Sequence, residues 1–401
     1  MSLLIKNCRI LEKGKVFLKN ILIKNGKIAK IANKEQKADK IIDAKNNFVL
    51  PGIIDCHVHF REPGLTHKED FLTGSMAAAK GGITTFLDMP NTIPPTATIS
   101  ALEEKRKLAS KSIVNYGLIF GATNDNVQDI KKAKNIAAVK LYMDSTTGEL
   151  KVDDYGFIAD VFRASKLTIL HAESENVKNA VEVLAKNKIK NRIHFAHVSS
   201  EKELNYAKNN KMKKQITVEV APHHLFMNDK DLQHLGAFAE MKPGLKTEND
   251  QKALWDGIKN GSVDTIATDH APHLREEKEQ GNYPFGVPGV ETLLPLLLNA
   301  FNENRITLPE IIRLCCENPA RIFSMKNKGS LKEGYDADMV IVDLDKRQAV
   351  RNEDLLTKCG WSPFDGKILK GWPVTTIVNG NVVYDNGEVF DIKAVEVRYA
   401  G

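Results

Sequence analysis

Apolar residues along the chain fall into two kinds of pattern. Between residues 52 and 334, short apolar runs alternate with helix-compatible stretches, whereas both chain ends hold short strand-like segments separated by turns. Regular alternation of strands and helices indicates parallel strands joined by helical crossovers. The alternation predicts eight strands, at residues 53–59, 84–89, 116–120, 138–143, 168–171, 193–197, 218–221 and 265–269.

Eight such repeats favour an α/β fold of the TIM type, a (β/α)8 barrel over residues 52–334, with an open doubly wound sheet as the alternative. Ser100 and Glu103 have the spacing of a capping box in front of one helix. The helices that the pattern predicts lie at residues 71–80, 101–109, 177–186, 201–209 and 251–259.

The two chain ends are both rich in predicted strands. Asn25-Gly26 and Asn379-Gly380 are typical of hairpin turns. The strands are expected at residues 3–10, 16–23, 27–31, 40–43, 338–344, 374–378 and 382–384. The simplest arrangement is that residues 1–51 and 335–401 together form one small β-domain beside the barrel.

Composition narrows the class of protein. A hydrophobic fraction of 42% suits a globular chain, and a net charge of +6 with scattered lysines offers no basic stripe for nucleic acid. No apolar run is long enough to cross a bilayer, so we expect a cytoplasmic protein without a membrane partner. The five cysteines are scattered and lack Cys-x-x-Cys spacing, which is typical of reduced thiols.

The first strand of the middle section carries candidate metal ligands. His57 and His59 are two residues apart and share one face of the strand. Neutral imidazole is the commonest metal ligand, although a single pair of histidines also fits a hydrogen-bonded core. Further polar residues lie in or at the ends of later strands, namely Lys140, His171, His197 and Asp269. Because barrel enzymes act at the C-terminal ends of their strands, the whole set predicts a catalytic metal centre.

These residues lie in motifs that resemble the amidohydrolase superfamily and, within it, the dihydroorotase family. The resemblance covers nearly the whole chain, and it implies that the β-rich flanks form a small β-sandwich beside the barrel. The motifs are Asp-Cys-His-Val-His-Phe-Arg-Glu-Pro-Gly (55–64), Met-Pro-Asn-Thr (89–92), Lys-Leu-Tyr-Met (140–143), His-Val-Ser (197–199), Ala-Pro-His-His-Leu (221–225) and Asp-His-Ala-Pro-His (269–273).

The resemblance implies two zinc ions per chain. His57, His59 and Asp269 would hold the first ion, and His171 with His197 would hold the second. A carboxylated Lys140 would bridge both ions, since a buried lysine with a lowered pKa supplies the neutral amine that adds CO₂. The alternative is a buried Lys140 paired with Asp269.

The same resemblance implies reversible hydrolysis of the cyclic amide of (S)-dihydroorotate to N-carbamoyl-L-aspartate, a step of de novo pyrimidine (UMP) biosynthesis. A hydroxide between the metals would be the nucleophile, and Asp269 would act as general base and acid. Two alternatives remain: another cyclic amidohydrolase, such as an allantoinase or a dihydropyrimidinase (hydantoinase), and a non-catalytic member of the superfamily. A homo-oligomer and an association with aspartate carbamoyltransferase are both left open.

Substrate binding is also assigned by resemblance. Arg61, with Asn91 and His273, would bind the substrate carboxylate, because a guanidinium can hold a carboxylate through two hydrogen bonds. This clamp argues against neutral ring substrates. The alternative for Arg61 is a surface salt bridge with Glu62 or Asp70.

Other substrate contacts come from three loops. The 144–148 loop resembles a mobile lid in which Thr146 would donate a hydrogen bond to the ligand. Pro288 and Gly289 match a loop whose backbone holds the pyrimidine ring. The chain departs from the family at two positions: Lys242 stands where many relatives have Asn or Arg, and Thr147 stands where some have an aromatic residue.

Overall fold

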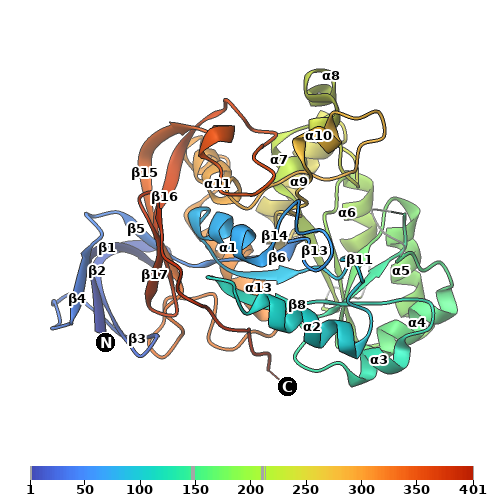
Figure 1. Ribbon diagram of the computed structural model, residues 1–401, viewed down its shortest axis with the longest axis horizontal. Helices are drawn as coiled ribbons and strands as arrows, with labels where there is room; N and C mark the ends of the chain where they lie inside the picture. The colour runs from blue at the N-terminus through green and yellow to red at the C-terminus, as the bar shows by residue number, and fades with distance from the viewer. Residues whose placement is uncertain (1, 146–149, 209–211, 213, 401) are drawn as a thin grey trace.

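The structure is a computed structural model that describes residues 2–145, 150–208, 212 and 214–400. Figure 1 shows a barrel surrounded by helices beside a sheet built from both chain ends. The eight barrel positions are β6 (Ile53–Val58), β7 (Ile83–Asp88), β8 with β9 (Asn115–Leu118 and Phe120–Gly121), β10 (Val139–Tyr142), β11 (Leu167–His171), β12 (Arg192–Phe195), β13 (Ile216–Val220) and β14 (Thr265–Ile266).

Neighbouring barrel strands pair in parallel all the way round. A further parallel bridge between Val58 and His270 connects the end of the chain's last barrel strand to the first. Every residue of β6, β7, β10 and β11 is buried, as expected for parallel strands covered on both faces. The predicted (β/α)8 barrel is therefore confirmed, and the open sheet is wrong.

The predicted helices are present with small shifts at their ends. One expected cap is wrong: the second helix starts two residues earlier, because Thr98 rather than Ser100 caps it by accepting from the backbone N–H of Ala101. The helices on the barrel are α1 (Phe71–Lys80), α2 (Ile99–Ala109), α3 (Val127–Lys132), α4 (Tyr155–Ala164), α5 (Glu175–Lys186), α6 (Glu201–Lys208), α9 (Glu248–Asn260) and α11 (Leu293–Asn302). Of these, α3, α4 and α11 were not predicted.

Both chain ends contribute to one hydrogen-bonded sheet of nine strands, which confirms that they form a β-rich terminal domain. The two ends meet where β5 pairs antiparallel with β15, with Leu50 opposite Val340. Its strands are β1 (Ser2–Glu12), β2 (Lys15–Lys24), β3 (Lys27–Ala32), β4 (Lys40–Asp43), β5 (Phe48–Pro51), β15 (Met339–Ala349), β16 (Ile368–Val378), β17 (Asn381–Asp385) and β18 (Glu388–Val389). The domain boundaries at residues 51 and 335 stay a prediction.

Two C-terminal segments leave this sheet and lie against the barrel. Residues near the C-terminus pair with β8, where the N–H of Val397 donates to the carbonyl of Tyr116. The 350–367 segment, which connects β15 to β16, reaches the catalytic end of the barrel, where Thr357 bonds Glu69 and Trp361 bonds His273. All five cysteines are buried and unpaired. Among the described residues, no helix is long and apolar enough to cross a membrane.

Candidate active site

The six predicted metal ligands line one small cavity at the C-terminal ends of the barrel strands. His57 and Lys140 lie within β6 and β10, and His171 is the last residue of β11. His197 and Asp269 lie just beyond the ends of β12 and β14. Parallel strands of a barrel end at the same face, which is why residues far apart in sequence meet here.

One group of ligands is formed by His57, His59 and Asp269. The Nε2 atoms of His57 and His59 lie 3.2 and 3.0 Å from Oδ1 of Asp269. The ligand atoms of all three residues are close enough to share one ion. Two imidazoles and a carboxylate are a donor set that suits Zn²⁺.

A second group lies across the cavity, where Nδ1 of His171 is 2.9 Å from Nε2 of His197. Nζ of Lys140 is fully buried and has no hydrogen-bond partner among the described residues, so the alternative pairing with Asp269 is absent. A buried amine without a partner is costly, and burial lowers the pKa of Lys140 from 10.5 to about 8. These residues therefore fit a second metal ion and a modified lysine.

Protonation also suits metal binding. Burial lowers the pKa of His59 to about 4 and that of His197 well below its usual value, so both rings are neutral at pH 7. Burial raises the pKa of Asp269, but His57 and His59 outweigh burial and hold it well below the usual range. Neutral imidazoles and an ionised carboxylate are the forms that coordinate a cation.

Three residues of the cavity have left-handed backbone conformations that non-glycine residues rarely adopt. Arg61, His197 and Asp269 have φ of +64°, +35° and +48°. Such conformations cost on the order of 1–3 kcal/mol each and concentrate at functional sites. They aim these side chains inward just after their strands end, and nothing in the sequence indicates them.

Glu219 of β13 lies beneath the cavity and was missed by the sequence analysis. Its Oε1 accepts hydrogen bonds from Nδ1 of His57 at 2.7 Å and from the backbone N–H of His197 at 3.1 Å. A carboxylate on the second ring nitrogen fixes the orientation of a ligating histidine. The ligand atoms of Cys56, His194 and Glu219 are also close enough to share an ion, but Cys56 and His194 both bond Oε2 of Glu219. The available signal was a glutamate inside a predicted buried strand.

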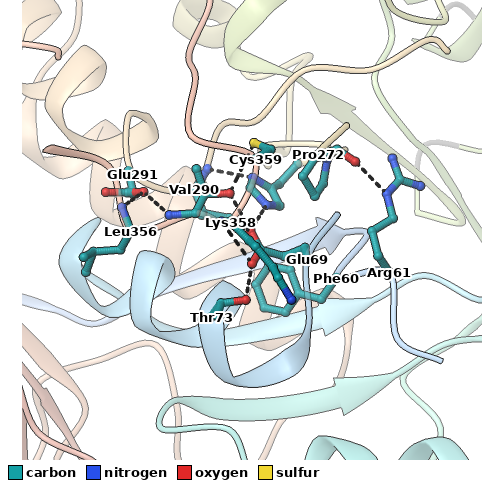
Figure 2. Close-up of polar contacts among 12 residues, drawn as sticks. Phe60, Arg61, Glu69, Thr73, Pro272, Val290, Glu291, Leu356, Lys358 and Cys359 are labelled. Atoms are coloured by element: carbon teal, nitrogen blue, oxygen red, sulfur yellow. Dashed lines mark hydrogen bonds and ion pairs between the residues drawn. The ribbon is translucent and has the colours of Figure 1, made fainter. Parts of the chain in front are cut away.

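Arg61 lines the same cavity and is almost fully buried, so the alternative of a surface salt bridge is wrong. Its Nε donates to the carbonyl of Pro272 at 3.0 Å, as Figure 2 shows, and one terminal nitrogen lies 2.9 Å from Nε2 of His273. Glu62 pairs with Lys111 instead. Burial lowers the pKa of Arg61 to about 10, which leaves it charged at pH 7.

Asn91 and Lys242 complete the polar lining of the cavity. Oδ1 of Asn91 accepts from Nδ1 of His59 at 2.6 Å, which orients the ring of His59. Nζ of Lys242 lies 4.6 Å from the ring centroid of Phe285, in cation–π contact.

The remaining predicted substrate residues do not line this cavity. His273 is buried behind Arg61 and Phe285. Pro288 and Gly289 line a separate small cavity together with His270 and Trp361. Thr146 and Thr147 lie outside the described residues. The roles assigned to these residues stay predictions.

The 350–367 segment of the β-rich domain is anchored beside this site by two buried glutamates (Figure 2). Glu69 accepts from the hydroxyl of Thr357 and from the N–H of Lys358, the latter at 3.1 Å. Glu291 accepts from the N–H groups of Leu356 and Thr357, both at 2.9 Å. Trp361 of the same segment donates to the carbonyl of His273, whose ring contacts Arg61, and the sequence analysis did not predict this contact.

Comparison with known proteins agrees with this geometry. The model of the amidohydrolase family matches residues 48–383, and the chain belongs to that family. A dihydroorotase from Methanosarcina mazei is 38% identical over 95% of this chain and 93% of its own length, so within the family the chain groups with the dihydroorotases.

One further sequence relative and one solved structure are also similar to this chain. The multifunctional protein CAD of Squalus acanthias is 37% identical over 85% of this chain, which corresponds to 15% of that protein. Among solved structures, an L-hydantoinase (dihydropyrimidinase) from Arthrobacter aurescens superimposes with a TM-score of 0.94 at 28% identity and covers 99% of both chains.

Proposed function

We propose that this enzyme catalyses the reversible ring opening of (S)-dihydroorotate to N-carbamoyl-L-aspartate in pyrimidine biosynthesis. The observation that carries the proposal is the buried, charged Arg61 in the same cavity as the histidine and aspartate ligands. A fixed cation beside a hydrolytic metal site suits a cyclic amide that bears a carboxylate. The dihydroorotase relatives support this substrate over a neutral ring.

We further propose that the ligand set holds two zinc ions bridged by carboxylated Lys140. When bound, the ions lower the pKa of water and polarise the scissile carbonyl. Asp269 is an ionised carboxylate that faces the cavity, so it accepts a proton from the attacking water and returns it to the leaving ring nitrogen. Glu219 holds His57 in the orientation that ligation requires.

The substrate carboxylate is bound by Arg61, with Asn91 and His273 as partners. Lys242 adds positive charge at the cavity wall. The hydrogen bond from Thr146 to the ligand and the contacts of Pro288 and Gly289 with the pyrimidine ring stay predictions. A homo-oligomer or an association with aspartate carbamoyltransferase stays a prediction.

One assay series tests this function. Purified protein is supplied with carbamoyl-aspartate, allantoin and hydantoin, and turnover of each is measured together with metal content. We expect cyclisation of carbamoyl-aspartate, little opening of the neutral rings, and about two metal ions per chain. Faster opening of allantoin or hydantoin would replace the proposal by that activity, and absence of all turnover in metal-loaded protein would favour the non-catalytic alternative.

A further inference from the structure

Lys278 is a buried lysine that no step of the proposed reaction uses. It is the last residue of α10 (Arg275–Lys278), and its exposed fraction is 1%. In the part of the chain that the structure describes, its ammonium pairs with no carboxylate and bonds only backbone carbonyls. A buried charge is costly unless hydrogen bonds satisfy it, so the groups that hold this one define its role.

Three carbonyl oxygens stand in place of a counter-ion. The ammonium of Lys278 donates to the carbonyls of Glu240 at 3.1 Å, Pro284 at 3.0 Å and Gly286 at 3.1 Å. An ammonium has three N–H groups, so each has its own acceptor. Burial lowers the pKa of Lys278 from 10.5 to about 8, which leaves most of the amine charged at pH 7.

Two aromatic rings enclose the same ammonium. The ring centroids of Tyr283 and Trp361 lie 5.7 and 5.9 Å from Nζ of Lys278, within the range of a cation–π contact. Trp361 belongs to the 350–367 segment, so the β-rich domain covers this amine and keeps water from replacing it at the carbonyls.

The three carbonyls belong to two stretches of chain that form part of the active-site cavity wall. Met241 and Lys242, which follow Glu240, line the cavity, and so do Phe285 and Gly286. The stretches also meet through a hydrogen bond from the N–H of Gly286 to the carbonyl of Glu240 at 3.0 Å, and through the contact of Lys242 with the Phe285 ring. Lys278 itself does not line the cavity.

We propose that Lys278 is a positioning residue that ties the 240–242 stretch to the 284–286 stretch and thereby sets the width of the cavity for a ring substrate. Within the described ranges, the carbonyls of Pro284 and Gly286 accept from no other donor, so both lose their only partner without the ammonium. One backbone hydrogen bond and one cation–π contact would then hold the two stretches together. The inference rests on the proposed function only for the identity of the ring.

Nitrogen-15 NMR of ligand-free enzyme labelled at lysine tests the tie in the parent protein. An ammonium that donates all three protons to buried carbonyls exchanges slowly with water and keeps its N–H couplings, whereas an exposed ammonium loses them. The Lys278 signal is assigned through its couplings along the side chain, so no variant is needed. We expect a protected ammonium at pH 7. A neutral amine, or an ammonium in rapid exchange, would overturn the inference.

Lys278→Met tests the consequence for binding, because it keeps a straight side chain of similar length and removes all three donors. Orotate, a planar ring that bears a carboxylate, serves as the probe. We expect its affinity to fall by roughly tenfold and KM for the substrate to rise by a similar factor, since two cavity-wall carbonyls lose their donor. Metal content and kcat should stay within about twofold of the parent, because the metal ligands lie on other strands.

Lys328→Met is the matched control. Lys328 is also nearly buried, pairs with Asp338 at 2.6 Å and does not line the cavity, so its variant should lose stability without a change in KM. Unchanged orotate affinity in Lys278→Met, an equal loss in both variants, or a fall in kcat without a rise in KM would overturn the inference.

The proposed function can fail separately. If the parent enzyme binds no orotate and opens a neutral ring instead, the identity of the substrate is wrong. KM for that ring is then compared in the same two variants, and a rise in Lys278→Met alone supports the role of Lys278, whereas no rise overturns it.

Discussion

The two halves of the cavity are built from different parts of the chain and carry opposite charge. The metal half consists of imidazoles and a carboxylate in or just after barrel strands, and Glu219 of the barrel itself accepts from His57 beneath them. The anion half presents Arg61, behind which His273 and Lys68 are buried, and the backbone carbonyl of His273 accepts from Trp361 of the β-rich domain. One half therefore belongs to the barrel alone, and the other depends on both domains.

This difference determines how a substrate is oriented in the cavity. Arg61 is a fixed cation that can hold a carboxylate through two hydrogen bonds, so on the proposed function a cyclic amide that bears one is turned with its carboxylate toward Arg61. Its amide bond then faces Asp269. On the proposed function, the metal half supplies the hydrolytic chemistry and the anion half selects the substrate. Mutations in the metal half should thus lower metal content without weakening orotate binding, and mutations in the anion half should do the reverse. Four substitutions test this separation.

The largest effect is expected from Lys140→Ala, which removes from the metal half the side chain that we propose bridges the two ions. Turnover should fall to background, because ligand positions that share one bridge lose both metal ions together. Orotate affinity should remain close to that of the parent, since Arg61 is untouched. Activity and metal content per chain are measured in parallel with Lys132→Ala, an exposed lysine of α3, as the control.

Adding short carboxylic acids to Lys140→Ala provides a second test. Such acids can occupy the place of a lysine carbamate, so we expect them to restore part of the activity. Parent-like turnover in Lys140→Ala would show that another residue bridges the metals.

Arg61→Lys is expected to give the next largest effect, this time in the anion half. The charge remains but the planar fork is lost. Losing one charge-assisted hydrogen bond in a buried site costs on the order of 1.5–3 kcal/mol, which is a fall of roughly ten- to more than a hundredfold in kcat/KM. Orotate should lose affinity by a similar factor while metal content is unchanged. Normal turnover of dihydroorotate, or improved opening of allantoin, would remove Arg61 from the carboxylate site.

The metal half could be predicted from the sequence much further than the anion half. His57, His171 and Lys140 lie in or at the ends of apolar strands, so the strand pattern and barrel geometry together indicate that they converge. The fold followed from the same alternation. Even there, Glu219 was missed, because a single buried glutamate does not reveal which histidine it bonds.

The anion half depends on contacts that no local pattern encodes. Trp361 bonds a carbonyl 88 positions earlier in the chain, and Lys68 bonds a ring 205 positions later. The left-handed backbone of Arg61, which directs its side chain into the cavity, also has no sequence signal. These features arise from how the 350–367 segment and the loop after β14 pack together in three dimensions.

Glu219→Gln tests whether the metal half depends on its support within the barrel. The amide keeps the size of the side chain but loses the negative charge that accepts from His57. Removing a carboxylate behind a ligating histidine weakens metal affinity by roughly ten- to a hundredfold. Zinc titration against a competing chelator measures this, and orotate affinity at saturating zinc should stay unchanged. An unaltered zinc affinity would show that His57 is oriented without Glu219.

The smallest effect is expected from Trp361→Phe. This variant tests whether the anion half, unlike the metal half, depends on the β-rich domain. The substitution keeps an aromatic ring but removes the indole N–H that donates to the carbonyl of His273 at 2.7 Å. Leaving that buried carbonyl without its donor costs about 1–3 kcal/mol of stability and loosens the backbone that carries His273. We expect KM for dihydroorotate to rise severalfold with metal content unchanged.

Trp372→Phe provides the matched control. Its indole N–H donates to the carbonyl of Leu369 at 3.1 Å, within the same β-rich domain. Neither Trp372 nor Leu369 lines the cavity. Trp372→Phe should therefore lose about as much stability as Trp361→Phe without a change in KM. A rise in KM in Trp361→Phe alone would establish that the 350–367 segment tunes the anion half. Equal KM values in the two variants would mean that both halves of the cavity are properties of the barrel, and the contrast between them would then be one of charge only.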